Sequence, residues 1–306
     1  MRREGEREMA MSQEELLRSP AVWQPRSPEE AASMKTAFGP DAVYAAGSTL
    51  LRTQWEAGTA TMPRHLIDLG RVAGLKGITE DGAETVIGPM TTLTECRTSE
   101  RLAESAPILV EAVKAIAGWS VRNLATLGGN VVFRVGDSVP ALIALNASLE
   151  WLEGSRRVRT SAEEWAAAPS SASRLLTSIR IPGGEAGARA NAKRFCAYHK
   201  VGRREAFTPS LVTIAIQGTR EEDGISSIRI AAGGGQTTPV RMTRAEELLL
   251  GGRPDANLLQ AVYEAVLEQY EPKTDPFAAD LYRKQTAANL VAAALWTQFR
   301  DSASKG

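Results

Sequence analysis

Apolar residues recur at the spacing of an α-helix in three parts of the chain. In the first, one face of the helix carries Leu102, Leu109, Val113, Ile116 and Ala117. Similar apolar stripes run through two segments near the C-terminus. The pattern therefore predicts amphipathic helices over residues 101–118, 257–270 and 281–299.

A fourth helix is predicted from its start signal rather than from an apolar stripe. Ser27 can cap the first turn. Pro28 suits the first helical position, because the N–H that proline lacks would be unpaired there anyway. The helix should run over residues 27–38.

Short apolar runs bounded by Gly, Asp or Pro predict β-strands. They are residues 41–47, 65–70, 84–90, 211–218 and 227–234. The last two runs are separated by a polar turn, so they should pair as an antiparallel hairpin. Strands and helices alternate without an internal repeat, which predicts an α+β fold.

Two changes of composition divide the chain. Residues 1–20 are dense in charges of both signs and poor in apolar residues, so a disordered tail is expected there. At residues 181–192 Gly, Ala and Pro replace the periodic pattern. This second change predicts a domain boundary.

Composition limits the classes of function. Of the 306 residues 43% are hydrophobic, and 36 basic residues balance 36 acidic ones, so the charge does not favour nucleic acid as a partner. The longest apolar run, residues 139–147, is far shorter than the roughly 20 residues of a membrane-spanning helix. No signal-peptide pattern opens the chain. The sequence therefore predicts a cytoplasmic protein.

Metal-binding and nucleophilic motifs are scarce. Cys96 and Cys196 form no CxxC pair and cannot hold an iron–sulfur cluster, which takes about four ligands. His65 and His199 are too few for a metal cluster. The sequence has no GxGxxG after a strand, no GxxxxGK[ST] and no HExxH. Any chemistry is expected to come from a bound cofactor, and any iron–sulfur cluster to lie on another chain.

Two glycine turns are the best candidates for a cofactor site. YAAGSTL at residues 44–50 follows a predicted strand, and ATLGGNV at residues 125–131 follows a predicted helix. Consecutive N–H groups in such turns bind anionic oxygens, and glycine permits their close approach. Together the turns could hold the two phosphates of a dinucleotide, although ordinary turn chemistry explains each one taken alone.

The order of these motifs resembles that of one family. AAGSTLL and ATLGGN, with LIDLGRVAGLKGI and IGPMTTLTE between them, resemble the FAD-binding medium subunit of molybdenum hydroxylases of the xanthine dehydrogenase and carbon monoxide dehydrogenase type. The resemblance continues through GDSVPALIALNASLEW, YHKVGRREAF, IAAGGGQTTPVRMTRAEELLLG and DPFAADLYRKQTAANLV. It covers residues 21 to 300.

The resemblance implies a fold and the boundaries of its domains. It implies a vanillyl-alcohol-oxidase (PCMH)-type FAD-binding domain over residues 21–184, built from α+β subdomains at about 21–72 and 73–184. A C-terminal α+β domain of the CO dehydrogenase flavoprotein type would follow at residues 188–306.

The resemblance also implies the residues that bind FAD; none of them is expected to act as an acid or base. Those of the two turns, around the pyrophosphate, are Tyr44, Ala45, Ala46, Gly47, Ser48, Thr49 and Leu50, and then Thr126, Leu127, Gly128, Gly129 and Asn130. Asp137 would accept hydrogen bonds from the ribose or adenine. The residues expected near the isoalloxazine ring are Ile116, Leu176, Tyr198, His199 and Lys200. Which of the last two faces the ring is left open.

The sequence departs from the family pattern in two places. The family has two adjacent glycines followed by Thr-Asp, whereas here Ala46 precedes Gly47 and Ser48 and Thr49 follow. A positive φ at Ala46 would cost about 1 kcal/mol. Pro89 removes a backbone donor near the expected ring site. Either change could lower the affinity for FAD.

Several other conspicuous residues have structural interpretations. Trp119 and Trp151 are expected to anchor the core or an interface. Arg203 and Arg204 are expected to form a solvated or interface pair. The two cysteines should behave as small apolar side chains. A turn leading into the next helix is enough to explain residues 237–241, TTPVR.

The resemblance implies an electron-transfer subunit. It would take electrons from the [2Fe–2S] cluster of a small partner subunit, fed by a molybdenum-cofactor large subunit that acts on a purine, and pass them to NAD+ or another acceptor. The complex would be a heterotrimer, doubled by symmetry. One alternative is a UDP-N-acetylmuramate-dehydrogenase-like flavin reductase, although an IPG sequence is expected there before the second turn. The other alternative is a scaffold subunit that has lost FAD.

Overall fold

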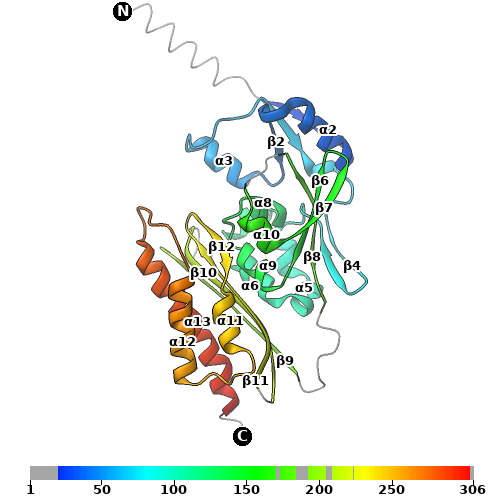
Figure 1. Ribbon diagram of the computed structural model, residues 1–306. Coiled ribbons are helices and arrows are strands. Elements are labelled where there is room, and N and C mark those ends of the chain that lie inside the picture. The colour runs from blue at the N-terminus through cyan, green and yellow to red at the C-terminus, as the bar shows by residue number, and fades with distance from the viewer. Residues whose placement is uncertain (1–19, 170–172, 184–191, 205–208, 223, 304–306) are drawn as a thin grey trace, which may run out of the picture.

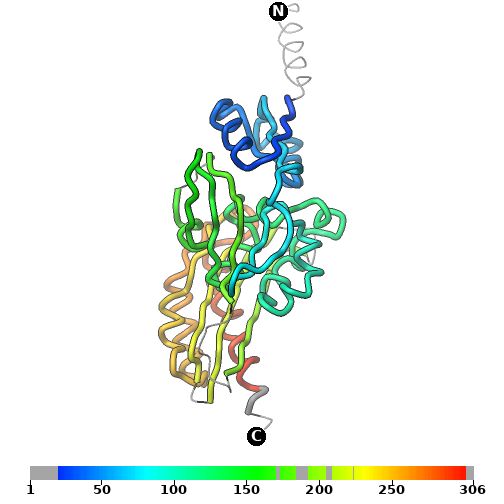
Figure 2. The backbone as a smooth tube through the Cα atoms, turned by 90° about the vertical axis from the view of Figure 1, so that its right-hand side faces the viewer, coloured from blue at the N-terminus to red at the C-terminus, as the bar shows by residue number. Residues whose placement is uncertain are grey.

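Three β-sheets, each accompanied by helices, follow one another along the molecule (Figure 1). The computed structural model describes residues 20–169, 173–183, 192–204, 209–222 and 224–303. The predicted tail, apart from its last residue, and residues 184–191 around the predicted domain boundary lie outside these ranges. Figure 2, turned by 90°, shows the N-terminal part of the described chain, drawn in blue, as a lobe at one end of the molecule.

The first sheet is small and parallel. Its strands are β1 (Ala21–Trp23), β2 (Ala42–Ala45) and β3 (His65–Asp68), in the order β1-β3-β2. The elements around them are α2 (Pro28–Phe38), α3 (Thr49–Glu56) and the 3-10 turns Gly39–Asp41 and Leu69–Arg71. The predicted N-cap is confirmed, because Ser27 Oγ accepts a hydrogen bond from the Glu30 N–H.

The second sheet has the order β4-β5-β8-β6-β7 and is antiparallel throughout. Its strands are β4 (Ile78–Asp81), β5 (Glu84–Ile87), β6 (Ser148–Glu153), β7 (Arg156–Ser161) and β8 (Leu175–Ile181). The helices of this part are α4 (Leu93–Thr98), α5 (Glu100–Ser105), α6 (Pro107–Lys114), α7 (Trp119–Arg122), α8 (Leu127–Val132), α9 (Val139–Ala144) and α10 (Ala162–Ala167). Short helices therefore carry the chain between the strands.

The single helix predicted over residues 101–118 is wrong. The chain instead forms α5 and α6, which are separated at Ala106. Pro107 is the cause, because it lacks the N–H that would continue α5 but suits the first position of a new helix. Helix α6 ends at Lys114, two residues before Ile116.

The third sheet is antiparallel in the order β12-β11-β10-β9. Its strands are β9 (Lys193–Gly202), β10 (Ser210–Glu221), β11 (Gly224–Gly234) and β12 (Thr237–Arg241), and its helices are α11 (Thr243–Leu249), α12 (Ala256–Gln269) and α13 (Asp280–Ala303). The predicted hairpin and both C-terminal helices are confirmed. The turn predicted over residues 237–241 is wrong: TTPVR is an edge strand, which tolerates proline because the edge needs no N–H.

The C-terminal sheet is covered on both faces. On one face its apolar side chains pack with those of α12 and α13. On the other face Ala215 and Ala231 join the core that contains the wholly buried helix α9. This second contact fixes β10 and β11 against α9 in the middle of the molecule.

The tryptophans predicted as anchors have different environments. Trp151 is fully buried in the main core, and the predicted apolar behaviour of Cys96 is confirmed by its place in the same cluster. Trp119 instead has 67% of its surface exposed, so it is not a core residue. Arg203 and Arg204 are exposed as predicted, and the Arg203 guanidinium lies 4.0 Å from the centre of the Phe277 ring.

A buried arginine ties the last helix to the C-terminal sheet. Arg283 of α13 is fully buried, donates to the Leu211 carbonyl and pairs with Asp275 Oδ2 at 2.6 Å. Burial by itself would raise the pKa of Asp275, but hydrogen bonds from the N–H groups of Phe277 and Ala278, together with the charge of Arg283, outweigh it and lower this pKa.

Replacing Asp275 with Asn is expected to lower the free energy of unfolding by about 2 kcal/mol at neutral pH, because a buried guanidinium loses its counter-charge. A carboxyl whose folded pKa is depressed stabilises the protein above its unfolded value of about 4, and this contribution is lost as the pH falls through the folded value. Thermal unfolding followed from neutral pH into acid should therefore show wild type and D275N converging. A difference that stays constant with pH would contradict this role.

Among the helices of the described ranges, none combines the length and the apolar character that a membrane crossing requires.

Candidate functional site

The first glycine turn presents an uninterrupted row of main-chain donors. Strand β2 ends at Ala45, and α3 begins after Ser48, whose backbone is left-handed with a φ of 54° and whose side chain does not cap the helix. Within the described residues, the N–H groups from Gly47 to Leu51 donate to no protein acceptor. A helix N-terminus also carries partial positive charge, so this row suits an anionic oxygen.

A buried hydroxyl stands just before this row. Tyr44 Oη is inaccessible to solvent and has no hydrogen-bond partner in the described part of the chain. Burial raises the pKa of this phenol to about 12, so it remains a neutral donor. Leaving such a group unpaired costs about 1–3 kcal/mol, which favours a ligand that brings an acceptor.

Gly47 brings the first turn against the second. A Cβ at this position would lie 1.9 Å from the Leu124 carbonyl oxygen and 3.0 Å from the Ala125 Cα. No side chain fits at such distances without moving the backbone. The glycine therefore serves a contact within the protein, which sets the two predicted turns side by side.

The second turn uses its donors internally, which corrects the expectation that its N–H groups would bind phosphate. Thr126 caps α8, and its side-chain oxygen accepts from the Gly129 N–H. The other main-chain bonds of the turn run from Leu127 to the Thr91 carbonyl, from Gly128 to the Pro89 carbonyl and from Asn130 to the Thr126 carbonyl. These bonds make the turn a rigid support for the first one.

Pro89 takes part in that support. Its carbonyl accepts from Gly128, and a Cβ on Gly128 would lie 2.4 Å from the Pro89 side chain. Thr92 and Thr126 form an isolated antiparallel bridge beside this contact. The IGPMTTL motif and the second turn are therefore packed together, and proline costs this contact no donor because its carbonyl makes the bond.

Asn130 and Asp137 hold the chain that follows α8. The Asn130 Oδ1 atom accepts from the N–H and the hydroxyl of Ser138, at 3.0 and 2.6 Å. Asp137 was expected to accept from ribose or adenine. In the structure its Oδ1 accepts from the Ser210 hydroxyl at 2.6 Å and its Oδ2 pairs with Lys200 Nζ at 2.7 Å. Both oxygens thus already bind the C-terminal domain, although a carboxylate has further lone pairs to offer.

The alternation of β9 separates Tyr198 and Lys200 from His199. The Tyr198 hydroxyl donates to the Asp137 carbonyl at 2.8 Å, and Lys200 Nζ donates to the Ala115 carbonyl at 2.9 Å. His199, between them, is exposed. Since alternate side chains of a strand point to opposite faces, Lys200 is the one that shares a face with Tyr198, toward Ala115 and Asp137.

Ile116 and Leu176 belong to the main core. Ile116 follows α6, and Leu176 lies in β8 opposite Trp151; their exposed fractions are 8% and 4%. The structure therefore brings the 126–130 turn, Ile116, Leu176 and the inward face of β9 into one region of the protein. Contact of these residues with a flavin ring stays a prediction.

Sequence reasoning missed two residues of this region, Arg122 and Ser210. Arg122 is nine-tenths buried and donates to three main-chain carbonyls. A basic residue inside the mostly apolar segment before the second turn was a signal that could have identified it. Ser210 reaches Asp137 only because the third sheet folds back, and no local pattern signals that contact.

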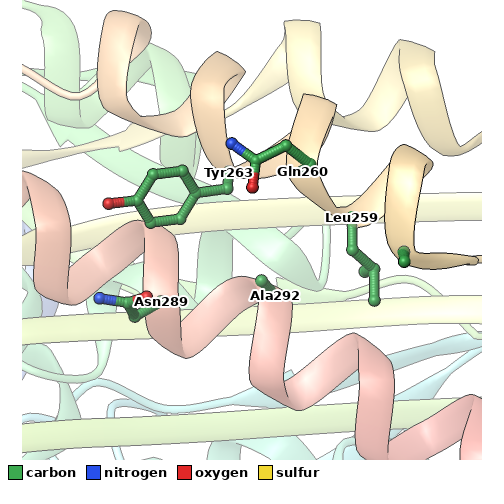
Figure 3. A pocket seen from close by; sticks show the side chains of 6 residues that line it. Leu259, Gln260, Tyr263, Asn289 and Ala292 are labelled. Carbon is green, nitrogen blue, oxygen red and sulfur yellow. The ribbon is translucent and has the colours of Figure 1, made fainter.

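A separate groove lies far from this region in the chain. It has a volume of about 300 Å³ between α12 and α13, where Tyr263 and Asn289 face each other across the two helices (Figure 3). No residue of the glycine turns lines it. Among the described residues, no three His, Cys, Asp or Glu side chains gather in a way that could hold a metal ion.

Replacing Ala46 with Gly, the residue that the family has at this position, is not expected to tighten cofactor binding. The left-handed residue of the turn is Ser48, so Ala46 carries none of the strain that a positive φ would impose. We expect the FAD dissociation constant to change by less than about threefold, and the free energy of unfolding to fall by about 0.5–1 kcal/mol because glycine adds backbone entropy to the unfolded chain. Isothermal titration calorimetry checks this, and tenfold tighter binding would show that the methyl group obstructs the cofactor.

The N-terminus of α3 has free main-chain donors and lies against the second glycine turn. A small parallel sheet and a larger antiparallel sheet accompany these turns. This arrangement is that of a dinucleotide-binding protein of the vanillyl-alcohol-oxidase type. Comparison with known families agrees. Residues 14–184 match the FAD binding domain in molybdopterin dehydrogenase, and residues 197–297 match the CO dehydrogenase flavoprotein C-terminal domain.

Individual proteins give the same result. The carbon monoxide dehydrogenase medium chain of Hydrogenophaga pseudoflava is 30% identical over 89% of this chain and 94% of its own length. A putative xanthine dehydrogenase FAD-binding subunit of Escherichia coli is 28% identical over 72% of this chain and 76% of its own. A crystal structure of Cu,Mo-CO dehydrogenase superposes with a TM-score of 0.83 at 26% identity, over 90% of this chain and 96% of the other. The chain belongs to the family of FAD-binding medium subunits of molybdenum hydroxylases.

The residues present fit FAD. The row of free N–H groups from Gly47 to Leu51 offers donors to a pyrophosphate, and the unpaired Tyr44 hydroxyl offers one more. Gly47 keeps the turn that carries them close to the second turn. The departures at Ala46 and Pro89 obstruct neither feature, so the cofactor that the family implies agrees with the site.

Proposed function

We propose that this chain is the subunit that carries electrons from a [2Fe–2S] partner subunit to a soluble acceptor, within a complex whose large subunit holds the molybdenum cofactor. The observation that carries the proposal is the row of free main-chain donors from Gly47 to Leu51, packed against the second glycine turn. The printed names of the relatives, a medium chain of carbon monoxide dehydrogenase and an FAD-binding subunit of xanthine dehydrogenase, support the subunit role.

The residues have distinct tasks in this proposal. The N–H groups of the first turn bind the pyrophosphate, with Thr126 to Asn130 as the rigid floor beneath it. Ile116, Leu176 and Tyr198 contact the isoalloxazine ring, and the Lys200–Asp137 ion pair lies on the same side. FAD, when bound, supplies the exchange between one-electron and two-electron transfer. The protein binds and orients it, and no side chain acts as acid or base.

The match of residues 197–297 to the CO dehydrogenase flavoprotein C-terminal domain favours a subunit over the alternative of a flavin reductase with its own substrate. We place the complex in the cytoplasm, as a heterotrimer doubled by symmetry. We divide this chain into its two domains near residues 184–188. The purine substrate stays a prediction, and it concerns the large subunit.

NAD+ is the acceptor that can be tested first. Anaerobic addition of NADH to the FAD-loaded chain should bleach the visible flavin absorption, because hydride transfer runs in both directions when the potentials are close. A matched addition of NADPH serves as the control for cofactor choice. If dithionite bleaches the flavin but NADH does not, NAD+ is not the acceptor, and the proposal then requires another one.

The partner subunits can be tested by co-expression with affinity purification. A tag on this chain should recover the small and large subunits in equal amounts. Recovery of this chain alone, at a full complement of FAD, would contradict the heterotrimer.

A further inference from the structure

Two cations donate hydrogen bonds to four consecutive carbonyls at the C-terminal end of α6. Arg122 Nη1 donates to the carbonyls of Lys114, Ile116 and Ala117, at 3.3, 2.9 and 2.6 Å. Lys200 Nζ donates to the carbonyl between them, that of Ala115, at 2.9 Å. The last carbonyls of a helix have no partner within it and carry partial negative charge, so the two cations satisfy and neutralise the end of α6.

The backbone at this point is strained. Ala117 has a φ of 48°, which an L-residue with a side chain rarely adopts and which costs about 1 kcal/mol or more. The shortest of the Arg122 contacts goes to the carbonyl of this residue. Arg122 therefore holds the turn that contains Ile116 in a conformation it would otherwise leave.

The two cations differ in their counter-charges. Lys200 is paired with Asp137, so the charge of that pair is balanced locally. No carboxylate in the described part of the chain forms an ion pair with Arg122, whose exposed fraction is only 9% and whose Nε has no partner. Its charged neighbour is another cation, Arg97, and burial together with this neighbour lowers the pKa of Arg122. An arginine keeps its proton even so.

A buried cation without a carboxylate partner is costly, and the partial negative charge at the end of α6 offsets only part of its desolvation. Hydrogen bonds to the carbonyls alone could be made by a neutral amide. The positive charge itself therefore calls for an explanation, and its position beside Ile116 offers one.

We propose that Arg122 is a positioning residue for the isoalloxazine ring: it fixes the Lys114–Ala117 turn next to the ring, and its positive charge, which no carboxylate of the described residues balances, favours the reduced cofactor. This rests on the proposed function, in which Ile116 contacts the ring. The ring gains negative charge when it accepts electrons, and a nearby positive charge in a low-dielectric region stabilises that charge.

Three variants of the full-length chain separate the charge from the hydrogen bonds. R122Q removes the positive charge but keeps an amide N–H₂ donor. R122K keeps the positive charge but replaces the planar guanidinium group with an ammonium group. R97Q removes a neighbouring exposed charge and is the matched control. Each is loaded with FAD and titrated spectroelectrochemically for its midpoint potential, with the FAD dissociation constant and the unfolding midpoint of the cofactor-free chain measured alongside.

R122Q should shift the midpoint potential to more negative values. It should also weaken FAD binding about tenfold, because the turn next to the ring loses the hydrogen bonds that hold it. R122K should restore the potential but not the full affinity, and R97Q should match wild type in both. A potential unchanged in R122Q would overturn the proposal even if the variant is less stable, because that result is what a purely structural arginine gives. If R122Q does not fold, R122K provides the test. A shifted midpoint potential in R122K would overturn the proposal, because this variant keeps the positive charge.

The outcome also distinguishes this inference from the proposed function. A wild-type chain that binds no FAD overturns both. A wild-type chain that binds FAD normally, with variants that behave like R97Q, overturns the role of Arg122 alone.

Discussion

Asp137→Ala is expected to lower the free energy of unfolding by about 3 kcal/mol, because it leaves the Lys200 ammonium buried without its counter-charge. The side chains of Asp137 and Lys200 are only 12% and 11% exposed, and the ion pair joins the segment after α8 to β9 of the C-terminal domain. The same substitution removes the acceptor of the Ser210 hydroxyl. Chemical denaturation of the cofactor-free chain gives the measurement.

A double-mutant cycle separates the ion pair from the other effects of this change. K200M removes the cation, and in D137A/K200M neither charge is left unpaired, so the double variant should be less destabilised than the two single variants added together. Glu56→Ala, which breaks the exposed Arg52–Glu56 pair, is the control and should behave as wild type. Additive losses in the cycle would mean that Asp137 and Lys200 do not stabilise the protein as a pair.

Gly47→Ala is the second change with a large expected effect. The added methyl group would lie 1.9 Å from the Leu124 carbonyl oxygen, so the two glycine turns must move apart. Strain of this kind typically costs about 1–3 kcal/mol, which corresponds to about five- to 150-fold weaker FAD binding if it falls on the cofactor-bound form. The ratio of flavin to protein after purification, and titration with added FAD, report this loss.

Gly58→Ala is the matched control for Gly47→Ala. Gly58 lies just after the other end of α3, has a φ of 66°, and would place a Cβ in open space. It therefore carries the cost of a left-handed alanine without any clash. We expect G58A to bind FAD as wild type does. Equal losses of FAD in G47A and G58A would show that the close contact with Leu124 has no special role.

The helices and the hairpin could be predicted because their signals are local. The cap at Ser27 and the apolar stripes of α12 and α13 depend on neighbours within a few residues. The break at Pro107 was also local, but the apolar pattern continued across it and hid the change. The TTPVR strand could not be predicted from its proline, because only the sheet order shows that this strand lies at an edge.

The site could be predicted in outline and not in its hydrogen bonds. The glycines marked both turns, yet the sequence does not show that the N–H groups of 127–130 are paired within the chain while those of 47–51 are free. That difference depends on Pro89 and Thr91, which come from another part of the chain. The sequence alone likewise does not show that Lys200, rather than His199, shares the inward face of β9 with Tyr198.

The central claim is that the first turn, supported by the second, binds FAD. The most direct test is the visible absorption spectrum of the purified chain, with its flavin released by denaturation and identified. This account predicts the two visible bands of oxidised flavin and about one FAD per chain, the cofactor through which the protein acts. A colourless chain that takes up no added FAD would contradict the account, and the alternative of a scaffold subunit without cofactor would replace it.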